Sequence, residues 1–154
     1  MKFIEFSTFR SDGSLIQLYE ILSIFDEYGN KLFWSIIEYY GSGGIPPNGM
    51  GIPDFEKLIL SKKFGYFLSF KELNFFAKSV ITTPNLYVAN QTIDCLIVAA
   101  ISNSSIINVM NNNDRIEKEL FNECNVVIEA FDGFNWSIWT SQEDLVKKIK
   151  EYFT

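Results

Sequence analysis

The stretch richest in glycine and proline, residues 40–53 (YGSGGIPPNGMGIP), comes closest to a catalytic motif. A phosphate-binding P-loop ends in Gly-Lys followed by Ser or Thr, because the lysine reaches the phosphates and the hydroxyl holds magnesium. Here no lysine or arginine lies between Lys31 and Lys57, and Pro46 stands where a dinucleotide-binding loop has its third glycine. Three prolines also remove N–H donors that an anion would need. We therefore predict a surface connection, which either only joins two elements or binds a partner.

Carboxylates are the other side chains that could do chemistry, as acid–base pairs or as metal ligands. Asp26 is next to Glu27, and Asp54 is two residues from Glu56. Such close neighbours do not lie on one face of a helix. We therefore predict that both pairs belong to a solvated surface, where most carboxylates are found.

Two further carboxylates interrupt apolar segments. Asp94 lies in the most apolar stretch, residues 93–101, and Glu129 lies in the strand-like residues 126–131. Because a buried carboxylate needs a partner, we expect Asp94 either near the exposed end of its strand or bonded to a backbone N–H. For Glu129 the open choices are a solvent-lined row available to a partner, or a β-bulge that re-aims the side chain. A carboxylate-dependent hydrolase centred on either residue is the alternative from the enzyme class.

The chain has 154 residues, no histidine and two cysteines. Without histidine it lacks the usual general base and any Ser-His or Cys-His nucleophile pair. A structural zinc site, which needs four Cys or His ligands, has too few candidates. We therefore expect a protein that is not an enzyme and that uses no metal and no cofactor.

Charge is unevenly distributed along the chain. The formal net charge is −6, and residues 20–56 contain six acidic residues against Lys31 alone, which makes a local net charge of −5. This balance argues against nucleic acid as a partner, since phosphate backbones select basic surfaces. It suits a basic protein partner, which an acidic surface would attract and orient. The alternative is that the acidic residues only keep a small protein in solution.

Nothing in the chain predicts export or membrane insertion. The first residues, MKFIEF, lack the apolar run of a signal peptide, and the longest apolar run, residues 93–101, is too short to span a bilayer. We therefore expect a cytoplasmic protein with no membrane partner. Cys95 and Cys124 form no CxxC motif, and we expect free buried thiols, with a single disulfide as the alternative.

The periodicity of the first half mixes strands with helices. Residues 2–8 predict a short strand, residues 31–40 an aromatic-rich strand, and residues 53–61 a short helix. Helical spacing also connects Leu15, Leu18, Leu22 and Phe25, with Ser14 and Gln17 as a capping box and Gly29 as the end. A hairpin is the competing interpretation of that segment. Ser69 caps a further predicted helix, which carries Val80 and is broken at Pro84-Asn85.

The second half predicts a central strand, a helix and a final hairpin. Residues 93–101 are the best candidate for a strand covered on both faces. Residues 102–113 are expected to be loop-like apart from an apolar patch at 106–110, and residues 114–124 to form a helix. Residues 140–143 cap a final helix.

Two strands, residues 126–131 and 134–140, are joined by Asp132-Gly133, a type I′ hairpin signal. Pairing across this turn would place Glu129 opposite Trp136. Trp136 and Trp139 point to opposite faces, so we expect one in the core and the other partly exposed. The mixed order of elements predicts one α+β domain over residues 1–154, with a mixed, mostly antiparallel sheet, packed helices, a C-terminal β-hairpin and a terminal helix.

Several segments together resemble one family of bacterial proteins. They are residues 33–38 (FWSIIE), 40–43 (YGSG), 47–50 (PNGM), 65–73 (GYFLSFKEL), 91–97 (QTIDCLI) and the hairpin containing FDG and WSIW at residues 131–139. This pattern covers most of the chain and is similar to the small immunity proteins encoded beside bacterial polymorphic toxins, including those of contact-dependent growth inhibition systems. The resemblance implies a non-enzymatic cytoplasmic protein that binds its cognate toxin domain and blocks it. Such toxins are often nucleases with basic clefts, and the family is too diverse for toxin-contacting positions to transfer.

Together with the charge distribution, this resemblance leads to a specific hypothesis. The protein binds the C-terminal domain of a cognate toxin and occludes its basic active site by imitating the charge of the substrate. The expected contact residues come from the acidic window and its aromatic neighbours: Asp26, Glu27, Glu38, Tyr39, Tyr40, Asp54 and Glu56. The alternative is a binding module for another protein or for a small ligand.

Overall fold

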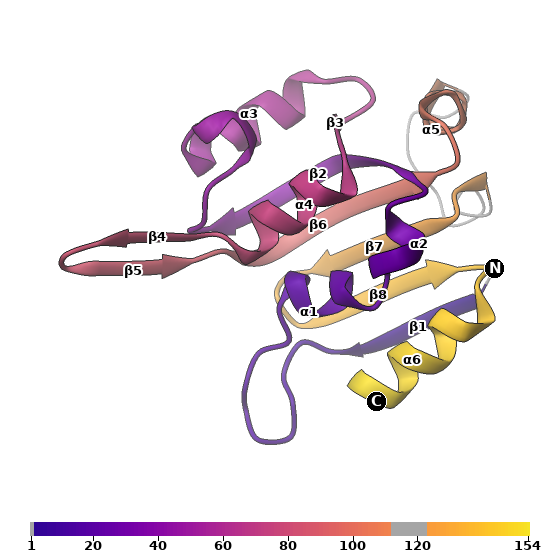
Figure 1. Cartoon of the computed structure of the whole chain (residues 1–154), viewed down its shortest axis with the longest axis horizontal. Coiled ribbons are helices and arrows are strands. Elements are labelled where there is room, and N and C mark those ends of the chain that lie inside the picture. The colour runs from indigo at the N-terminus through magenta and orange to yellow at the C-terminus, as the bar shows by residue number, and fades with distance from the viewer. Residues whose placement is uncertain (1, 112–122) are drawn as a thin grey trace.

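A six-stranded antiparallel sheet organises the protein, and the computed structural model in Figure 1 describes residues 2–111 and 123–154. The strand order is β1–β8–β7–β6–β2–β3, so the first strand lies beside the last one. The strands are β1 (Lys2–Ser7), β2 (Phe33–Ser42), β3 (Tyr66–Leu68), β6 (Gln91–Ala100), β7 (Val126–Phe131) and β8 (Asn135–Thr140). The predicted α+β class, central strand, final hairpin and terminal helix are confirmed.

Helices cover the two faces of the sheet unequally. They are α1 (Leu18–Ser23), α2 (Asp26–Gly29), α3 (Ile52–Ser61), α4 (Phe70–Lys78), α5 (Asn103–Asn111) and α6 (Glu143–Phe153). A 3₁₀ turn, η1 (Pro47–Gly49), precedes α3. All of these described helices except α5 contribute to one cluster, on what we call the first face, and α5 packs on the second face. In the described residues, no helix combines the length and the apolar character that crossing a lipid bilayer requires.

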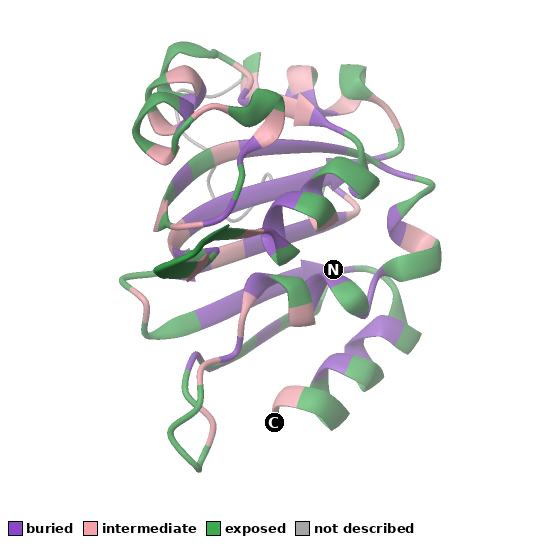
Figure 2. Cartoon of the chain, turned by 60° about the vertical axis from the view of Figure 1, so that its left-hand side comes forward, coloured by how far each residue is buried: buried purple, intermediate pink, exposed green. Residues whose placement is uncertain are grey.

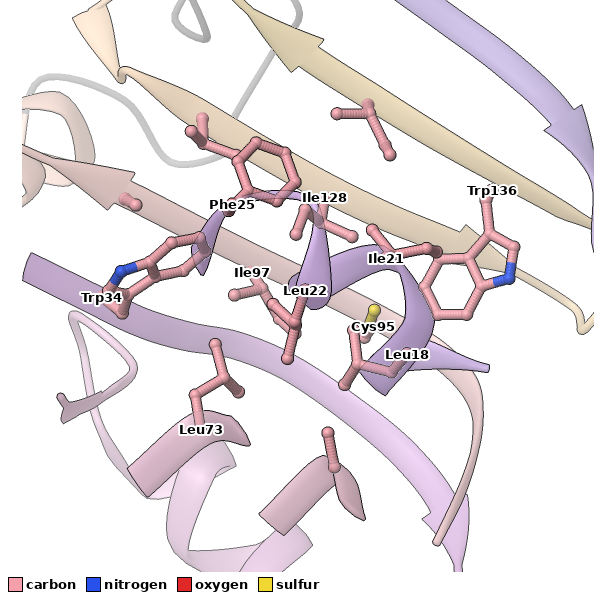
Figure 3. Packing of buried hydrophobic residues seen from close by; sticks show 14 of the residues in the cluster. Leu18, Ile21, Leu22, Phe25, Trp34, Leu73, Cys95, Ile97, Ile128 and Trp136 are labelled. Carbon is pink, nitrogen blue, oxygen red and sulfur yellow. The ribbon is translucent and has the colours of Figure 1, made fainter. Parts of the chain in front are cut away.

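The larger apolar cluster fills the first face of the sheet (Figure 3). Leu18, Ile21 and Leu22 of α1 are almost completely buried there, together with Ile97 and Cys95 of β6. These side chains recur at helical spacing on α1 and alternate along β6, so each element turns one apolar face inward. Burial of apolar surface of this kind is the main favourable term in folding.

Trp34 links the end of α2, strand β2 and the start of α4. It is fully buried, and its indole N–H donates to the Gly29 carbonyl at 2.9 Å. Its ring stacks on Phe70 with centroids 5.2 Å apart. Gly29 is needed at this point because a β-carbon there would lie 2.7 Å from the Phe70 ring. The contact therefore depends on a residue without a side chain.

A smaller apolar cluster lies on the second face, under α5. Val98 of β6, Val127 of β7 and Trp139 of β8 pack there against Ile106 and other residues of the helix. Trp139 is only 7% exposed. The expectation that one of the two strand tryptophans is partly exposed is therefore wrong, because alternate residues of β8 enter two different clusters. The two cysteines are buried and free, as expected.

The first helix begins later in the chain than the sequence predicted. Leu15 is extended and forms an isolated antiparallel bridge with Phe9, so the helix begins later in the chain. The carboxylate of Glu20 accepts from the backbone N–H of Gln17 at 2.7 Å, which makes these two residues the capping box in place of Ser14. The competing hairpin interpretation, which treated Ile21, Ile24 and Phe25 as strand residues, is wrong, because Ile21 lies in α1. The predicted single helix is divided into α1 and α2, and the second of these ends at Gly29, as expected.

A small hairpin replaces the end of another predicted helix. Ser69 caps α4 as predicted, and its hydroxyl accepts from the Glu72 N–H at 3.1 Å. The helix ends at Lys78, however, and residues 80–83 form β4 (Val80–Thr83), which pairs with β5 (Leu86–Ala89). Pro84-Asn85 is the turn between these strands. The β-branched run of β4 favours a strand, and this two-stranded sheet is separate from the main one.

Two further elements were not predicted. Strand β3 is three residues long and pairs with the edge of β2. Helix α5 occupies a segment that was expected to be mostly loop-like. Its serines and asparagines are weak helix formers, and burial of Ile106 and Val109 against the sheet compensates for this. The predicted helix at residues 114–124 lies almost entirely outside the described residues.

The β7–β8 hairpin has the predicted turn. Asp132 and Gly133 both have positive φ, 50° and 68°, as a type I′ turn requires. The Phe134 N–H closes this turn on the Phe131 carbonyl at 3.1 Å. The dipeptide signal in the sequence therefore identified the correct turn residues.

The register beyond the turn is one residue away from the prediction. Phe134 is an extra residue, and its carbonyl accepts from a backbone N–H that follows β1. Glu129 therefore faces Ser137 and not a tryptophan. The shift also pairs Ile128 with Ile138, and both are fully buried. Because a slip of one residue exchanges the two faces of a strand, burial of these isoleucines fixes the register.

The close approach at Gly29 gives a stability prediction. Gly29→Ala should lower the free energy of unfolding by about 1–3 kcal/mol, because the new methyl group must displace the Phe70 ring. The control is Gly51→Ala, whose β-carbon would meet only Pro53, at 3.8 Å. Urea denaturation of both variants measures the difference. Equal losses in the two variants would contradict the packing described for Trp34.

Candidate functional site

Strand alternation sorts the charges of the main sheet onto two faces. The six strands contain four acidic residues, Glu5, Glu38, Asp94 and Glu129, and one basic residue, Lys2. Lys2 lies on the first face with the buried side chains of β1, and its ammonium group contacts a carboxylate of α6 at 2.7 Å. Pairing with second-face residues places all four acidic residues on the second face.

Three of the acidic residues lie in one row across the sheet. Glu38 faces Leu96, Leu96 faces Glu129, Glu129 faces Ser137, and Ser137 faces Glu5. Neighbouring strands lie about 4.8 Å apart, so successive acidic residues in the row are separated by roughly 10 Å. Glu5 and Glu38 are exposed, and Glu129 is half-buried. The row crosses five strands and includes no cationic residue.

Aromatic side chains adjoin the row. Tyr40 faces Asp94 across β2 and β6 and is 56% exposed. Phe131 lies two residues beyond Glu129 on the same face and is 68% exposed. We call the surface formed by Glu5, Glu38, Tyr40, Asp94, Glu129 and Phe131 the acidic sheet face. Exposed aromatic rings are enriched in surfaces that bind other proteins, and carboxylates beside them favour a partner of positive charge.

A β-bulge puts Glu38 and Tyr40 on this face. The pairing of β2 with β6 shifts between Ile36 and Glu38, so Ile37 is an extra residue. Ile36 faces the first cluster before the bulge, and Tyr39 faces it afterwards. Without the bulge, Glu38 and Tyr40 would point into the core. Helix α5 packs at the other end of the second face, and no other described helix contributes to the apolar cluster of that face.

The electrostatics of Cys95 reflect the same arrangement. Burial raises the pKa of the Cys95 thiol, and the negative charges of Glu129, Asp94 and Glu38 raise it further. These three carboxylates, which lie on three neighbouring strands, are therefore all close enough to the Cys95 thiol to raise its pKa. The thiol stays protonated and belongs to the core.

Asp94 has a structural partner. Its carboxylate accepts from the Asp132 N–H at 2.5 Å, and the Gly133 N–H donates to the Ile93 carbonyl at 3.0 Å. Two bonds thus tie the β7–β8 turn to strand β6. This is the backbone-bonded arrangement that the sequence offered as one explanation of a carboxylate in an apolar strand.

This bond predicts the effect of changing Asp94. Asp94→Ala replaces this hydrogen bond by one to water and should lower the free energy of unfolding by about 0.5–1.5 kcal/mol. Asp94→Asn keeps an oxygen that can accept, so it should cost less. Urea denaturation of the two variants gives the comparison. If alanine were no worse than asparagine, the carboxylate would not hold the turn.

The remaining predicted contact residues lie elsewhere. Asp26 and Glu27 are exposed on α2, beside a hollow of about 400 Å³ that Lys31 and Lys148 also line. Asp54 is exposed on α3. The acidic window of the sequence therefore does not form one continuous surface, and of its members only Glu38 and Tyr40 belong to the acidic sheet face.

Glu56 and Tyr39 have roles within the fold. The Glu56 carboxylate accepts from the Gly41 N–H at 3.2 Å, next to the end of β2. Tyr39 is 8% exposed, and the amide of Asn90 donates to its hydroxyl oxygen at 2.6 Å. Burial raises the pKa of Tyr39 to about 12. Its ring therefore packs in the core and adds no area to a contact surface.

The raised pKa of Tyr39 predicts a loss of stability in alkali. The phenol of Tyr39 ionises near pH 10 in the unfolded chain and near pH 12 in the folded one. The contribution of Tyr39 to the free energy of unfolding should therefore be fully present below pH 10 and be lost as the pH rises towards 12. The loss from this group is on the order of 2–3 kcal/mol. In Tyr39→Phe, urea denaturation should show a shallower decline over this range. The control is Tyr40→Phe, at an exposed ring, and the hypothesis fails if both variants decline like the parent protein.

Sequence reasoning missed Glu5 and Phe131 and treated Glu129 and Asp94 as separate cases. The signal that joins them is the pairing of β1 with β8, which connects residues at opposite ends of the chain. A strand at residues 2–8 was predicted, but its partner was not. Placed beside β8, that strand brings Glu5 into the row.

Four of the surface hollows among residues 2–111 and 123–154 have volumes of about 400 to 530 Å³, and these four include neither Asp94 nor Glu129 in their lining. Among the described residues, no group of three or more Cys, Asp or Glu side chains is arranged to hold a metal ion. Comparison of the chain with protein-family models gave no match, and neither did comparison with curated proteins or with solved structures.

Proposed function

We propose that this protein is a non-enzymatic inhibitor that acts in the cytoplasm by covering a basic site on a partner protein with its acidic sheet face. The partner is the cognate toxin domain of a bacterial polymorphic toxin or contact-dependent growth inhibition system, and the inhibitor is the immunity protein. The observation that carries the proposal is the segregation of charge, because all four acidic residues of the main sheet share one face and its one basic residue lies on the other.

The geometry supports recognition of a broad basic surface. The row from Glu38 to Glu5 crosses five strands, so its charges are spread over roughly 20 Å. Negative charges spaced along a line attract a partner whose site binds a phosphate backbone, and they orient it during the encounter. Tyr40 and Phe131 supply the apolar contact area that charge alone does not provide.

The choice of a toxin as the partner rests on the resemblance to immunity proteins, whose toxins are often nucleases with basic clefts. Occlusion requires a surface that fits the toxin's active site, and we assign this role to the acidic sheet face. The net charge of −6 adds long-range attraction to a basic domain.

The experiment measures binding to the toxin domain encoded by the gene immediately upstream, at low and at high salt. We expect tight binding with association slowed by salt, because ions screen the charges that steer the encounter. The double variant Glu5→Lys with Glu38→Lys should bind at least about tenfold more weakly at low salt. In cells, the same variant should lose protection against the toxin.

The matched control is Asp26→Lys with Glu27→Lys, which makes the same change in net charge on α2. It should retain most of the affinity, since Lys31 and Lys148 already lie beside these residues. A larger loss in the control than in the sheet variant would move the contact surface to α2. Absence of binding to a folded partner domain would contradict the immunity assignment for that pair of proteins. Binding whose rate does not depend on the salt concentration would contradict the electrostatic mechanism.

A further inference from the structure

Two exposed aromatic rings flank one carboxylate on the acidic sheet face. Tyr40 of β2 pairs with Asp94 of β6, and the register of β6 with β7, continued by one residue, places Phe131 on the other side of Asp94. We call these three residues the aromatic row. Both rings are more than half exposed. Strands β6 and β7 are buried over most of their length and become more exposed at the end that holds this row (Figure 2).

The spacing of the aromatic row suits one cation. Neighbouring strands lie about 4.8 Å apart and side chains stand roughly perpendicular to a sheet, so the two rings are attached roughly 10 Å apart. A cation above Asp94 would lie about 5 Å from each attachment point. Cation–π attraction acts when the charge lies within about 6 Å of a ring centroid, so both rings can contribute. The row therefore combines one negative charge and two aromatic rings around the same position.

The carboxylate of Asp94 is already held in one position. It is half-buried, and its Oδ1 accepts from the Asp132 N–H at 2.5 Å. Among residues 2–111 and 123–154, no donor bonds to its second oxygen, Oδ2. A side chain whose rotamer is fixed before binding loses less conformational entropy when it accepts a new hydrogen bond. The bond that ties the β7–β8 turn to β6 therefore also positions an acceptor between the two rings.

Further carboxylates lie beside the aromatic row. Glu38 and Glu129 each lie two residues from one of its rings, on the same strand and the same face, which is roughly 7 Å along the strand. Both of them, like Asp94, raise the pKa of the Cys95 thiol, so the three carboxylates lie close to one another. Lys2, the one basic residue of the six strands, lies on the first face. The strands therefore offer the row no cation, and the charge around it favours a cation from a partner.

We propose that the aromatic row is a subsite for one arginine side chain of the partner, with the guanidinium between the rings of Tyr40 and Phe131 and hydrogen-bonded to Asp94. Arginine fits better than lysine, because a guanidinium is planar, stacks on aromatic rings, presents several N–H donors to a carboxylate and is more weakly hydrated than an ammonium group. Arginine is also common in sites that bind phosphate, which are the sites that the inhibitor would cover. The role of the subsite in toxin binding rests on the proposed function, whereas its affinity for a guanidinium does not.

The test uses a small probe, the amide of Nα-acetyl-arginine, and therefore needs no toxin. Titrated into the isotope-labelled full chain, the probe should shift the backbone amide NMR signals of Asp132 and Gly133, which adjoin Asp94, in a saturable manner. The corresponding lysine amide should bind more weakly, because it has no planar group to stack. The citrulline amide, which has nearly the same shape but no charge, should give no saturable shift.

Variants of the row identify the contacts. Asp94→Asn keeps an acceptor for the turn and removes the charge, so it should weaken binding of the probe by more than about fivefold. Tyr40→Leu and Phe131→Leu each remove one ring and should weaken it about two- to fivefold. Phe134→Leu removes a similarly exposed ring outside the row, and Asp54→Asn removes the same charge on α3, so both should bind the probe like the parent protein.

The outcomes separate this subsite from the proposed function. A probe that shifts no signal near Asp94, or that binds equally well to the parent protein and to Asp94→Asn, overturns the subsite even if the toxin domain binds. Lysine amide that binds as well as arginine amide overturns the choice of arginine. A probe that binds as expected while the toxin domain does not bind supports the subsite and contradicts the proposed function. Well-dispersed NMR spectra of the variants exclude misfolding as the cause of any loss.

Discussion

One extra residue in β2, Ile37, determines what both faces of the sheet present. Before Ile37, the side chains of Trp34 and Ile36 face the larger cluster, and after it the side chain of Tyr39 does. In an unbroken strand Glu38 would point into the core, where a carboxylate without a partner costs several kcal/mol. The bulge removes this conflict and places Glu38 on the opposite face, while the side chain of Ile37 packs against the smaller cluster. The core and the acidic sheet face therefore depend on the same local irregularity.

The second face changes from packed apolar residues to polar or exposed ones along β7 and β8. On β7 the order is Val127, Glu129, Phe131, and on β8, read in the opposite direction, it is Trp139, Ser137, Asn135. Helix α5 covers only the apolar end. Antiparallel sheets can keep one region in contact with water while another is packed, and this sheet does so within a single face. The boundary between the packed part and the solvated part of this face is the row that contains Leu96, an apolar residue that lies between Glu38 and Glu129.

Local signals in the sequence predicted local structure well. The Asp132-Gly133 turn, the Ser69 cap and the apolar run of β6 identified a turn, a helix start and a central strand, because each depends on neighbouring residues. The features that the sequence did not predict correctly depend on contacts between distant segments. The extra residue after the turn, the helical state of α5 and the pairing of β1 with β8 are decided by burial against segments far away in the chain. Of the site, Glu38 and Tyr40 were predicted from charge and aromatic content, but their neighbours come from β1, β6 and β7.

The pairing of β1 with β8 has a consequence for the order of folding. Residues 2–7 leave the ribosome well before residues 135–140, which form their partner strand. Contacts between such distant segments close last and slow the folding of a chain, because loop closure must precede them. During synthesis, strand β1 has no partner strand to cover Ile4 and Phe6 until residues 135–140 have been made. Glu5 therefore cannot join the other carboxylates before β8 has been made, and a truncated chain that lacks β8 has no strand on which to place it.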